Sequence, residues 1–236
     1  RSTLFPYTTL FRSSTDAKGR LARFDGMVAD ADKCDSAHFS REEVLDPQGM
    51  VLLSFIMDPR TGFGRYRDFR ISNYQLMDCL IDHLLVMPVD EIMQLEDLQE
   101  RVRLYEAHRE PFERMMKDHS RTEGAAVVTD LRGIDETFVG NRHIIYALYP
   151  DQNVSVRVFD GREGKNCVFS VGYSILNRTA TVDVGKLMLK YGGGGHRRVG
   201  TCQVPFEDAD RVLSEILEEI NSQNWQMLNI AGLEEF

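Results

Sequence analysis

The hydrophobic pattern of this 236-residue chain changes its period at Gly124, and this change constrains the fold more than any other feature. Across 18–122 apolar residues recur every three or four positions, and no clear strand pattern competes with helices. Beyond Gly124 short apolar and alternating segments follow, including one in which Val154, Val156 and Val158 share a face. We therefore expect a mostly helical first half and an α/β unit in the second.

Capping and turn residues locate the expected elements. Ser72 is a plausible N-cap for a helix that carries Leu76, Leu80 and Leu84 on one face. A long charged helix is predicted over 95–119, where Pro111 should kink it or start a new one. The second half reads, in order, as strand AAVVTDL, helix NRHIIYALYP, strands NVSVRVFDG and KNCVFSVGYS, helix VDVGKLMLKY, strand GTCQVP and a closing helix from FEDADRVL.

Composition limits the classes of function. The four cysteines form no C-x-x-C pair, which favours reduced thiols in the cytoplasm over a zinc or disulfide framework. The longest apolar runs, such as VLLSF, are too short to span a bilayer, so no membrane partner is expected. The net charge of −9 is unlike that of proteins that coat long duplexes. An anionic ligand should therefore be small and held in a local pocket.

The stretch YGGGGHRRVG, from Tyr191 to Gly200, is the most distinctive motif. Gly192 alone could be a helix stop, and the stretch a plain loop. Four glycines could also turn successive N–H groups toward one anion. His196 and Arg197 would then add donors suited to phosphate. Both interpretations, a phosphate cradle and a loop, remain open on composition alone.

Asp35 is the candidate metal ligand. It continues a helical face that carries Leu21, Phe24, Val28 and Ala31. Hard divalent cations need oxygen donors, although a capping or arginine partner would also explain a single carboxylate. The nearby Asp30 and Asp32 are spread around the helix and are interpreted as solvated, and Asp82 with His83 as a surface pair.

Arginines supply two further candidates. Arg178 follows GYSILN and precedes the helix that leads into the glycines, so it is either a plain surface arginine or one that converges on the same pocket. Arg60, Arg65, Arg67 and Arg70 crowd the segment DPRTGFGRYRDFR. That segment is either a basic loop that lines a cleft or a solvated turn.

The first thirteen residues, RSTLFPYTTLFRS, have neither helix nor strand period. They resemble the translation of a short-read sequencing adapter over their whole length. We interpret 1–13 as an artefact outside the fold. If so, the gene began upstream and the chain is a fragment.

The order strand, SILNRT, helix, GGGGHRRVG, strand and helix resembles the DHHA1 domain of DHH-family phosphoesterases. Gly193, Gly194, Gly195, His196 and Gly200 match the family pattern, while Arg198 and Val199 stand where the family usually has alanines. ADKCDSAHF looks like the last metal-binding motif of the family, with Asp35 as ligand. SFIMDPRTGFGRYRDFRISNYQLM resembles a branch described as exopolyphosphatase-related.

The resemblance implies an α/β fold in which a helical remnant of a DHH domain precedes a DHHA1-type domain with a small mixed sheet. We therefore divide the chain into the artefact (1–13), the mostly helical DHH remnant (14–95), a linker helix (96–122), the DHHA1 substrate-binding domain (123–222) and a tail (223–236). Arg178, Gly193, Gly194, Gly195, His196 and Arg197 become the expected substrate-binding residues.

The implied activity is metal-dependent hydrolysis of phosphodiester or phosphoanhydride bonds in short oligonucleotides, cyclic dinucleotides or polyphosphate. Mn²⁺ or Mg²⁺ would be the cofactor of the parent protein, and homodimerisation is an open alternative. No Asp-His-His triplet occurs in the sequence, so we expect the chain to bind no metal stably and to be inactive alone. The alternative is a nucleotide-binding module without catalysis. The related domain of alanyl-tRNA synthetases is a third interpretation, which the helical region with ADKCDSAHF disfavours.

Overall fold

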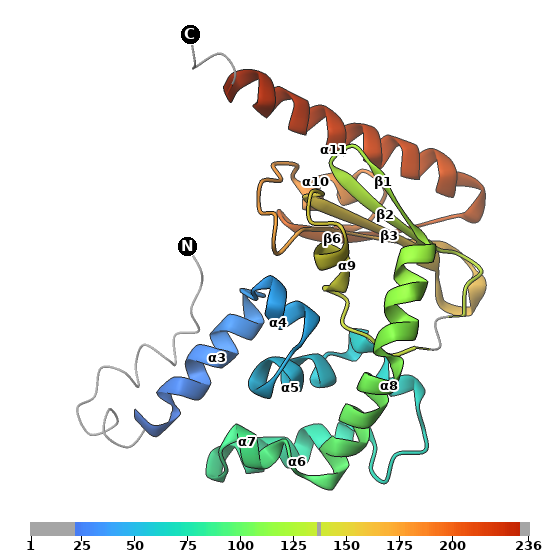
Figure 1. Ribbon diagram of the computed structural model, residues 1–236. Helices are drawn as coiled ribbons and strands as arrows, with labels where there is room; N and C mark the ends of the chain where they lie inside the picture. The colour runs from blue at the N-terminus through green and yellow to red at the C-terminus, as the bar shows by residue number, and fades with distance from the viewer. Residues whose placement is uncertain (1–21, 136–137, 232–236) are drawn as a thin grey trace. The chain divides into compact units, whose positions relative to one another are not determined.

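The computed structural model describes residues 22–135 and 138–231 (Figure 1). Contacts divide the chain into two units, 1–39 and 40–236. The described part of the first unit comprises the 3₁₀ helix η1 (Ala22–Phe24) and the helix α3 (Asp25–Asp35). The interpretation of 1–13 as an artefact, and the expected place of Leu21 on an apolar face, lie outside the described residues.

The helical part of the second unit consists of short helices followed by one long helix. The elements are α4 (Arg41–Leu45), α5 (Gly49–Met57), η2 (Pro59–Thr61), η3 (Phe63–Arg65), α6 (Asn73–Val86), α7 (Val89–Ile92) and α8 (Glu96–Asp118). The predicted cap of α6 is confirmed, because the Ser72 side chain accepts a hydrogen bond from the Gln75 amide at 3.2 Å. Leu76 and Leu80 are buried in the helical core with residues of α5 and α8.

The charged helix predicted over 95–119 is confirmed as α8, with Pro111 inside it. Pro111 therefore does not start a second helix. It lies at the half of α8 whose Phe112, Met115 and Met116 pack on the sheet, so one helix serves both the helical core and the α/β part.

The α/β part is built on a six-stranded mixed sheet of order β1-β2-β3-β4-β6-β5. The strands are β1 (Ser120–Glu123), β2 (Ala126–Leu131), β3 (Val154–Asp160), β4 (Cys167–Tyr173), β5 (Gly194–His196) and β6 (Val199–Val204). The helices are α9 (Ile144–Leu148), η4 (Arg162–Gly164), α10 (Val184–Leu189), η5 (Phe206–Asp208) and α11 (Ala209–Ala231). β2 and β3 are parallel and every other pair is antiparallel.

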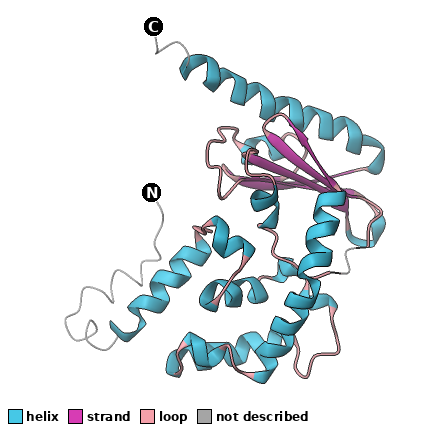
Figure 2. Ribbon diagram, in the orientation of Figure 1, coloured by secondary structure: helices cyan, strands magenta, loops and turns pink. Residues whose placement is uncertain are grey.

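Different helices cover the two faces of the sheet (Figure 2). One face carries Val154, Val156 and Val158 and packs on apolar residues of α10 and α11. The other packs, at Val127, on α9 and the end of α8. The predicted alternation of β3 is thus confirmed, and the side chains between these valines point to the face where α9 lies.

The α/β fold class with a small mixed sheet is confirmed. β1 was not predicted, because its sequence, SRTE, is polar and lies at the edge of the sheet. Within 22–135 and 138–231, no helix is both long and apolar enough to cross a membrane.

Candidate functional site

The glycine run begins as the C-terminal cap of α10. Gly192 adopts a φ of +74°, the left-handed conformation in which glycine commonly follows a helix. Its amide donates to the carbonyl of Leu189 at 3.1 Å, and the amide of Gly193 donates to that of Met188 at 3.0 Å. These two N–H groups thus bond to carbonyl groups of the last turn of α10. The expectation that successive glycine amides all point at one anion therefore does not hold for them.

The rest of the run forms β5, at the edge of the sheet. A Cβ on Gly193 would lie 2.1 Å from the Thr201 carbonyl oxygen, and one on Gly195 would lie 2.2 Å from that of Val199. Real Cβ atoms do not approach so closely, so glycine lets β5 and β6 form a tight hairpin. The run is built into the sheet and holds His196 on a strand.

Main-chain bonds fix the turn of this hairpin, while its side chains stay exposed. The carbonyl of Arg197 accepts from the Val184 amide at the start of α10 (3.0 Å), and that of Arg198 accepts from the Tyr173 amide (2.9 Å). Within the described parts of the chain, the exposed side chains of His196, Arg197 and Arg198 have no hydrogen bond or ion pair. Their N–H groups can therefore donate to an anion without first breaking an internal contact.

Arg178 lies in the loop that follows β4. Its Nε donates to the Ile175 carbonyl at 2.8 Å, and the side chain is exposed. The Ser174 hydroxyl accepts from the amides of Leu176 (3.2 Å) and Asn177 (2.9 Å), which makes the loop a compact turn. The loop that carries Arg178 begins at the end of β4 that bonds to the hairpin, because Tyr173, the last residue of β4, donates to the Arg198 carbonyl.

A row of residues runs from the hairpin across the sheet. Strand pairing aligns Ser155 with Gly172, Gly172 with Val199, and Val199 with His196. Residues directly opposite one another project from the same face. Because Val154 and Val156 are buried under α10 and α11, this row lies on the opposite face. Figure 1 shows α9 on that side of the strands.

A polar cluster links this face to the helical part of the second unit. Asp58 accepts two hydrogen bonds from the Arg60 side chain (2.7 and 2.8 Å) and one from Arg142 (3.1 Å). Burial would raise the pKa of the Asp58 carboxyl, but these bonds outweigh it and hold the pKa below its ordinary value. The carboxylate is therefore charged and already satisfied by two guanidinium groups.

His143 and Tyr146 continue the cluster toward the sheet. Burial, with the nearby charge of Arg142, lowers the pKa of His143 to about 3, so the ring is neutral near pH 7. The rings of His143 and Tyr146 lie 6.3 Å apart, and the Tyr146 hydroxyl and the Ser155 hydroxyl are 2.9 Å apart. The cluster that begins at Asp58 thus reaches Ser155, the first residue of the row that ends at His196.

The sequence reasoning missed this cluster. Asp58 before Pro59 is a local signal for a capped turn, and the structure shows that cap, a bond of 2.9 Å from the Arg60 amide. Nothing local connects Asp58 with Arg142, which lies 84 residues further along the chain. Their pairing depends on tertiary structure.

Three of the four arginines in the basic loop bond to other groups of the chain, two of them to carboxylates. Its arginines bond as follows: Arg60 to Asp58, Arg65 to the Phe138 carbonyl at 2.7 Å, and Arg70 to Asp97 through two bonds of 2.7 Å. Arg67 is exposed. All four arginines are exposed, which fits the solvated turn better than a basic cleft lining.

Asp35 ends α3 in the first unit and is exposed, as are Asp30, Asp32 and Asp82. Across the described residues, no group of three His, Cys, Asp or Glu side chains is placed to hold a metal ion. The Asp58 carboxylate already accepts hydrogen bonds from Arg60 and Arg142. The donor set of the described residues therefore does not fit the two-metal centre that the resemblance implies.

Comparison with known proteins places this geometry in a class. No protein-family model and no curated protein match the chain. The structure of a pGpG-specific phosphodiesterase, PggH from Vibrio cholerae, is 46% identical, with a TM-score of 0.77 over 85% of this chain and 67% of that one. An exopolyphosphatase-related protein from Bacteroides fragilis is 15% identical, with a TM-score of 0.38 over 64% of this chain and 46% of that one, a likeness too weak to support an inference.

The similarity to this phosphodiesterase indicates a protein of the phosphoesterase kind, and the α/β domain with its exposed cationic hairpin agrees with that class. Since the identity is 46% over 85% of this chain and 67% of that one, the chain belongs to the family of the pGpG-specific phosphodiesterase PggH.

Proposed function

We propose that this chain binds short phosphorylated nucleotides of the pGpG type, as the substrate-holding part of a phosphoesterase. The observation that carries this proposal is 46% identity to a pGpG-specific phosphodiesterase over 85% of the chain. The exposed side chains of His196, Arg197 and Arg198 support it, because guanidinium and imidazole N–H groups suit phosphate oxygens. Arg178 is the fourth candidate donor.

The glycines have a positioning role in this proposal. Gly193 and Gly195 let the hairpin close, and Gly194 lies between them in β5. A hairpin fixed by main-chain bonds loses little conformational freedom when it binds a ligand, which favours affinity. The overall charge of −9 fits a ligand held by a few local cations rather than by a broad basic surface.

Isothermal titration with pGpG tests the binding site. We expect the double variant His196→Ala, Arg197→Ala to bind at least about tenfold more weakly, since it loses two charge-assisted donors. Arg114→Ala is the matched control, because Arg114 is an exposed arginine of α8 that pairs with Glu110. GpG without its 5′-phosphate should also bind more weakly than pGpG. Equal affinity of the double variant and the unmodified chain would refute the site.

The proposal assigns binding, and not cleavage, to this chain. Its sequence has no Asp-His-His triplet, and its described residues gather no three metal-ligating side chains. Incubation of the chain with pGpG and Mn²⁺ should therefore leave the dinucleotide intact on anion-exchange chromatography. Cleavage that EDTA abolishes would overturn this part while leaving the binding proposal in place. Titration with inorganic tripolyphosphate tests the polyphosphate alternative.

A further inference from the structure

Val199 is an exposed apolar residue whose role the phosphate site does not explain. It is 48% exposed at the start of β6, directly beside the hairpin turn. Strand pairing sets Val199 opposite Gly172, which has no side chain.

Gly172 and Val199 together form a shallow shelf on the sheet. A Cβ built on Gly172 would lie 3.8 Å from Val199 Cγ2, 3.5 Å from the Tyr146 hydroxyl and 4.0 Å from the Ser155 hydroxyl. The bare backbone of Gly172 is thus bordered by an isopropyl group on one side and by two hydroxyls on the other. An apolar surface with a polar edge suits a nucleobase, which has a flat π-face and polar edge atoms.

The shelf is continuous with the candidate phosphate site. His196 is the next residue of the same row, and the row from Ser155 to His196 spans three strand spacings, about 14 Å. The cationic groups of the hairpin lie at one end of the row. Ser155, Gly172 and Val199, further along, carry no charge. A nucleotide with its phosphate at His196 would therefore have its base over the uncharged part.

We propose that Gly172 and Val199 form a platform for one nucleobase of the substrate, bordered by the mutually hydrogen-bonded hydroxyls of Ser155 and Tyr146. This inference rests on the proposed function, because it takes the hairpin as the phosphate site. It names two specificity-determining positions, 172 and 199, neither of which touches the phosphate. Apolar contact at Val199 favours a large base, so the platform should prefer purine to pyrimidine dinucleotides.

Filling the shelf is the sharpest test. A Cβ at position 172 meets only ordinary contacts, and glycine weakens a strand interior, so Gly172→Ala should fold at least as stably as the unmodified chain. We expect this variant to bind pGpG about tenfold more weakly, the usual effect of losing one stacked base. Its affinity for inorganic tripolyphosphate should not change. Val199→Ala should weaken pGpG binding about threefold and reduce the preference for pGpG over pUpU.

Two control variants match these changes. Leu189→Ala removes another exposed apolar side chain, 66% exposed on α10, and Gly64→Ala adds a methyl group to a glycine with no neighbour within 4 Å. Neither should alter pGpG binding. If Gly172→Ala and Val199→Ala bind pGpG like the unmodified chain while the His196 and Arg197 double variant does not, the platform is refuted and the phosphate site stands. Equal losses for pGpG and tripolyphosphate in Gly172→Ala would also refute it. No pGpG binding by the unmodified chain would refute both.

Discussion

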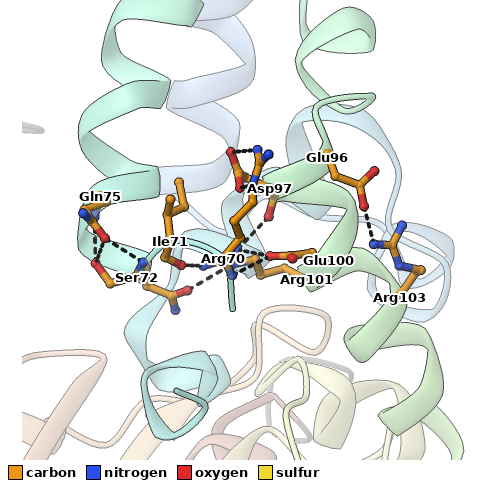
Figure 3. Close-up of polar contacts among 10 residues, drawn as sticks. Arg70, Ile71, Ser72, Gln75, Glu96, Asp97, Glu100, Arg101 and Arg103 are labelled. Atoms are coloured by element: carbon orange, nitrogen blue, oxygen red, sulfur yellow. Dashed lines mark hydrogen bonds and ion pairs between the residues drawn. The ribbon is translucent and has the colours of Figure 1, made fainter. Parts of the chain in front are cut away.

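Replacing Arg101 should destabilise the helical core far more than replacing its neighbour Arg103. The Arg101 side chain is fully buried on α8, and its guanidinium carbon lies 3.9 Å from the centre of the Phe69 ring. Figure 3 shows its contacts with the segment before α6 and with its own helix. It donates to the Ile71 carbonyl, to Asn73 Oδ1 (3.2 Å), to the Asp97 carbonyl (2.8 Å) and to Glu100 Oε2 (3.1 Å). One cation therefore holds the start of α6 against α8.

The magnitude follows from the contacts that Arg101→Ala removes. Two acceptors outside α8, the Ile71 carbonyl and Asn73 Oδ1, lose their donor, and each such loss in a buried place costs about 1–3 kcal/mol. The lost contact with Phe69 adds about 1 kcal/mol. These contributions sum to about 3–7 kcal/mol. We expect the lower part of that range, about 3–5 kcal/mol, which is usual when one partner of a buried charged network is removed.

Arg103→Ala is the control. Arg103 is 58% exposed and pairs at 2.7 Å with Glu96, itself 63% exposed, a kind of pair that contributes about 0–1 kcal/mol. Urea unfolding followed by circular dichroism should show a much lower midpoint for Arg101→Ala than for Arg103→Ala, at similar m-values. If the unfolding free energies of the two variants, obtained from midpoint and m-value, agree to within about 1 kcal/mol, the structural role given to Arg101 is refuted.

Three further predictions concern the site and its support. Because burial lowers the pKa of His143 to about 3 from the 6.5 of an exposed histidine, protonation favours the unfolded chain. The free energy of unfolding should therefore decrease as the pH falls from 6.5 toward 3, by up to about 1.4 kcal/mol per pH unit, and His143→Phe should lose that dependence in urea titrations. Gly192→Ala should cost about 1 kcal/mol by thermal unfolding because of its positive φ, whereas Gly194→Ala, with open space around it, should cost almost nothing. Gly195→Ala should abolish pGpG binding in titrations, because its Cβ would meet the main chain of β6.

The elements were predictable where local pattern determines them. The alternating valines of β3 and the Ser72 cap of α6 depend on residues a few positions apart, and both were confirmed. β1 was missed because its four residues are polar and gain their strand conformation by pairing with β2. Of the two alternatives for Pro111, a kink or a helix start, the helix start is wrong, because α8 continues through it.

The candidate site was less predictable, because it depends on pairings between distant segments. The motif containing His196 was found from the glycine run, but its place beside Val199 and Gly172 follows from strand register. Asp58 and Arg142 meet only in the folded chain. A sequence pattern can identify residue types suited to phosphate, whereas the row that would hold the rest of a nucleotide is visible only in the sheet.

Amide hydrogen exchange of the unmodified chain, with and without pGpG, tests the central claim most directly. If the hairpin holds the phosphate, pGpG should slow exchange in 194–201 and in the loop that carries Arg178. Exchange in the helices of 41–95 serves as the internal reference and should not change. Protection confined to those helices, or no change anywhere at saturating pGpG, would contradict the account.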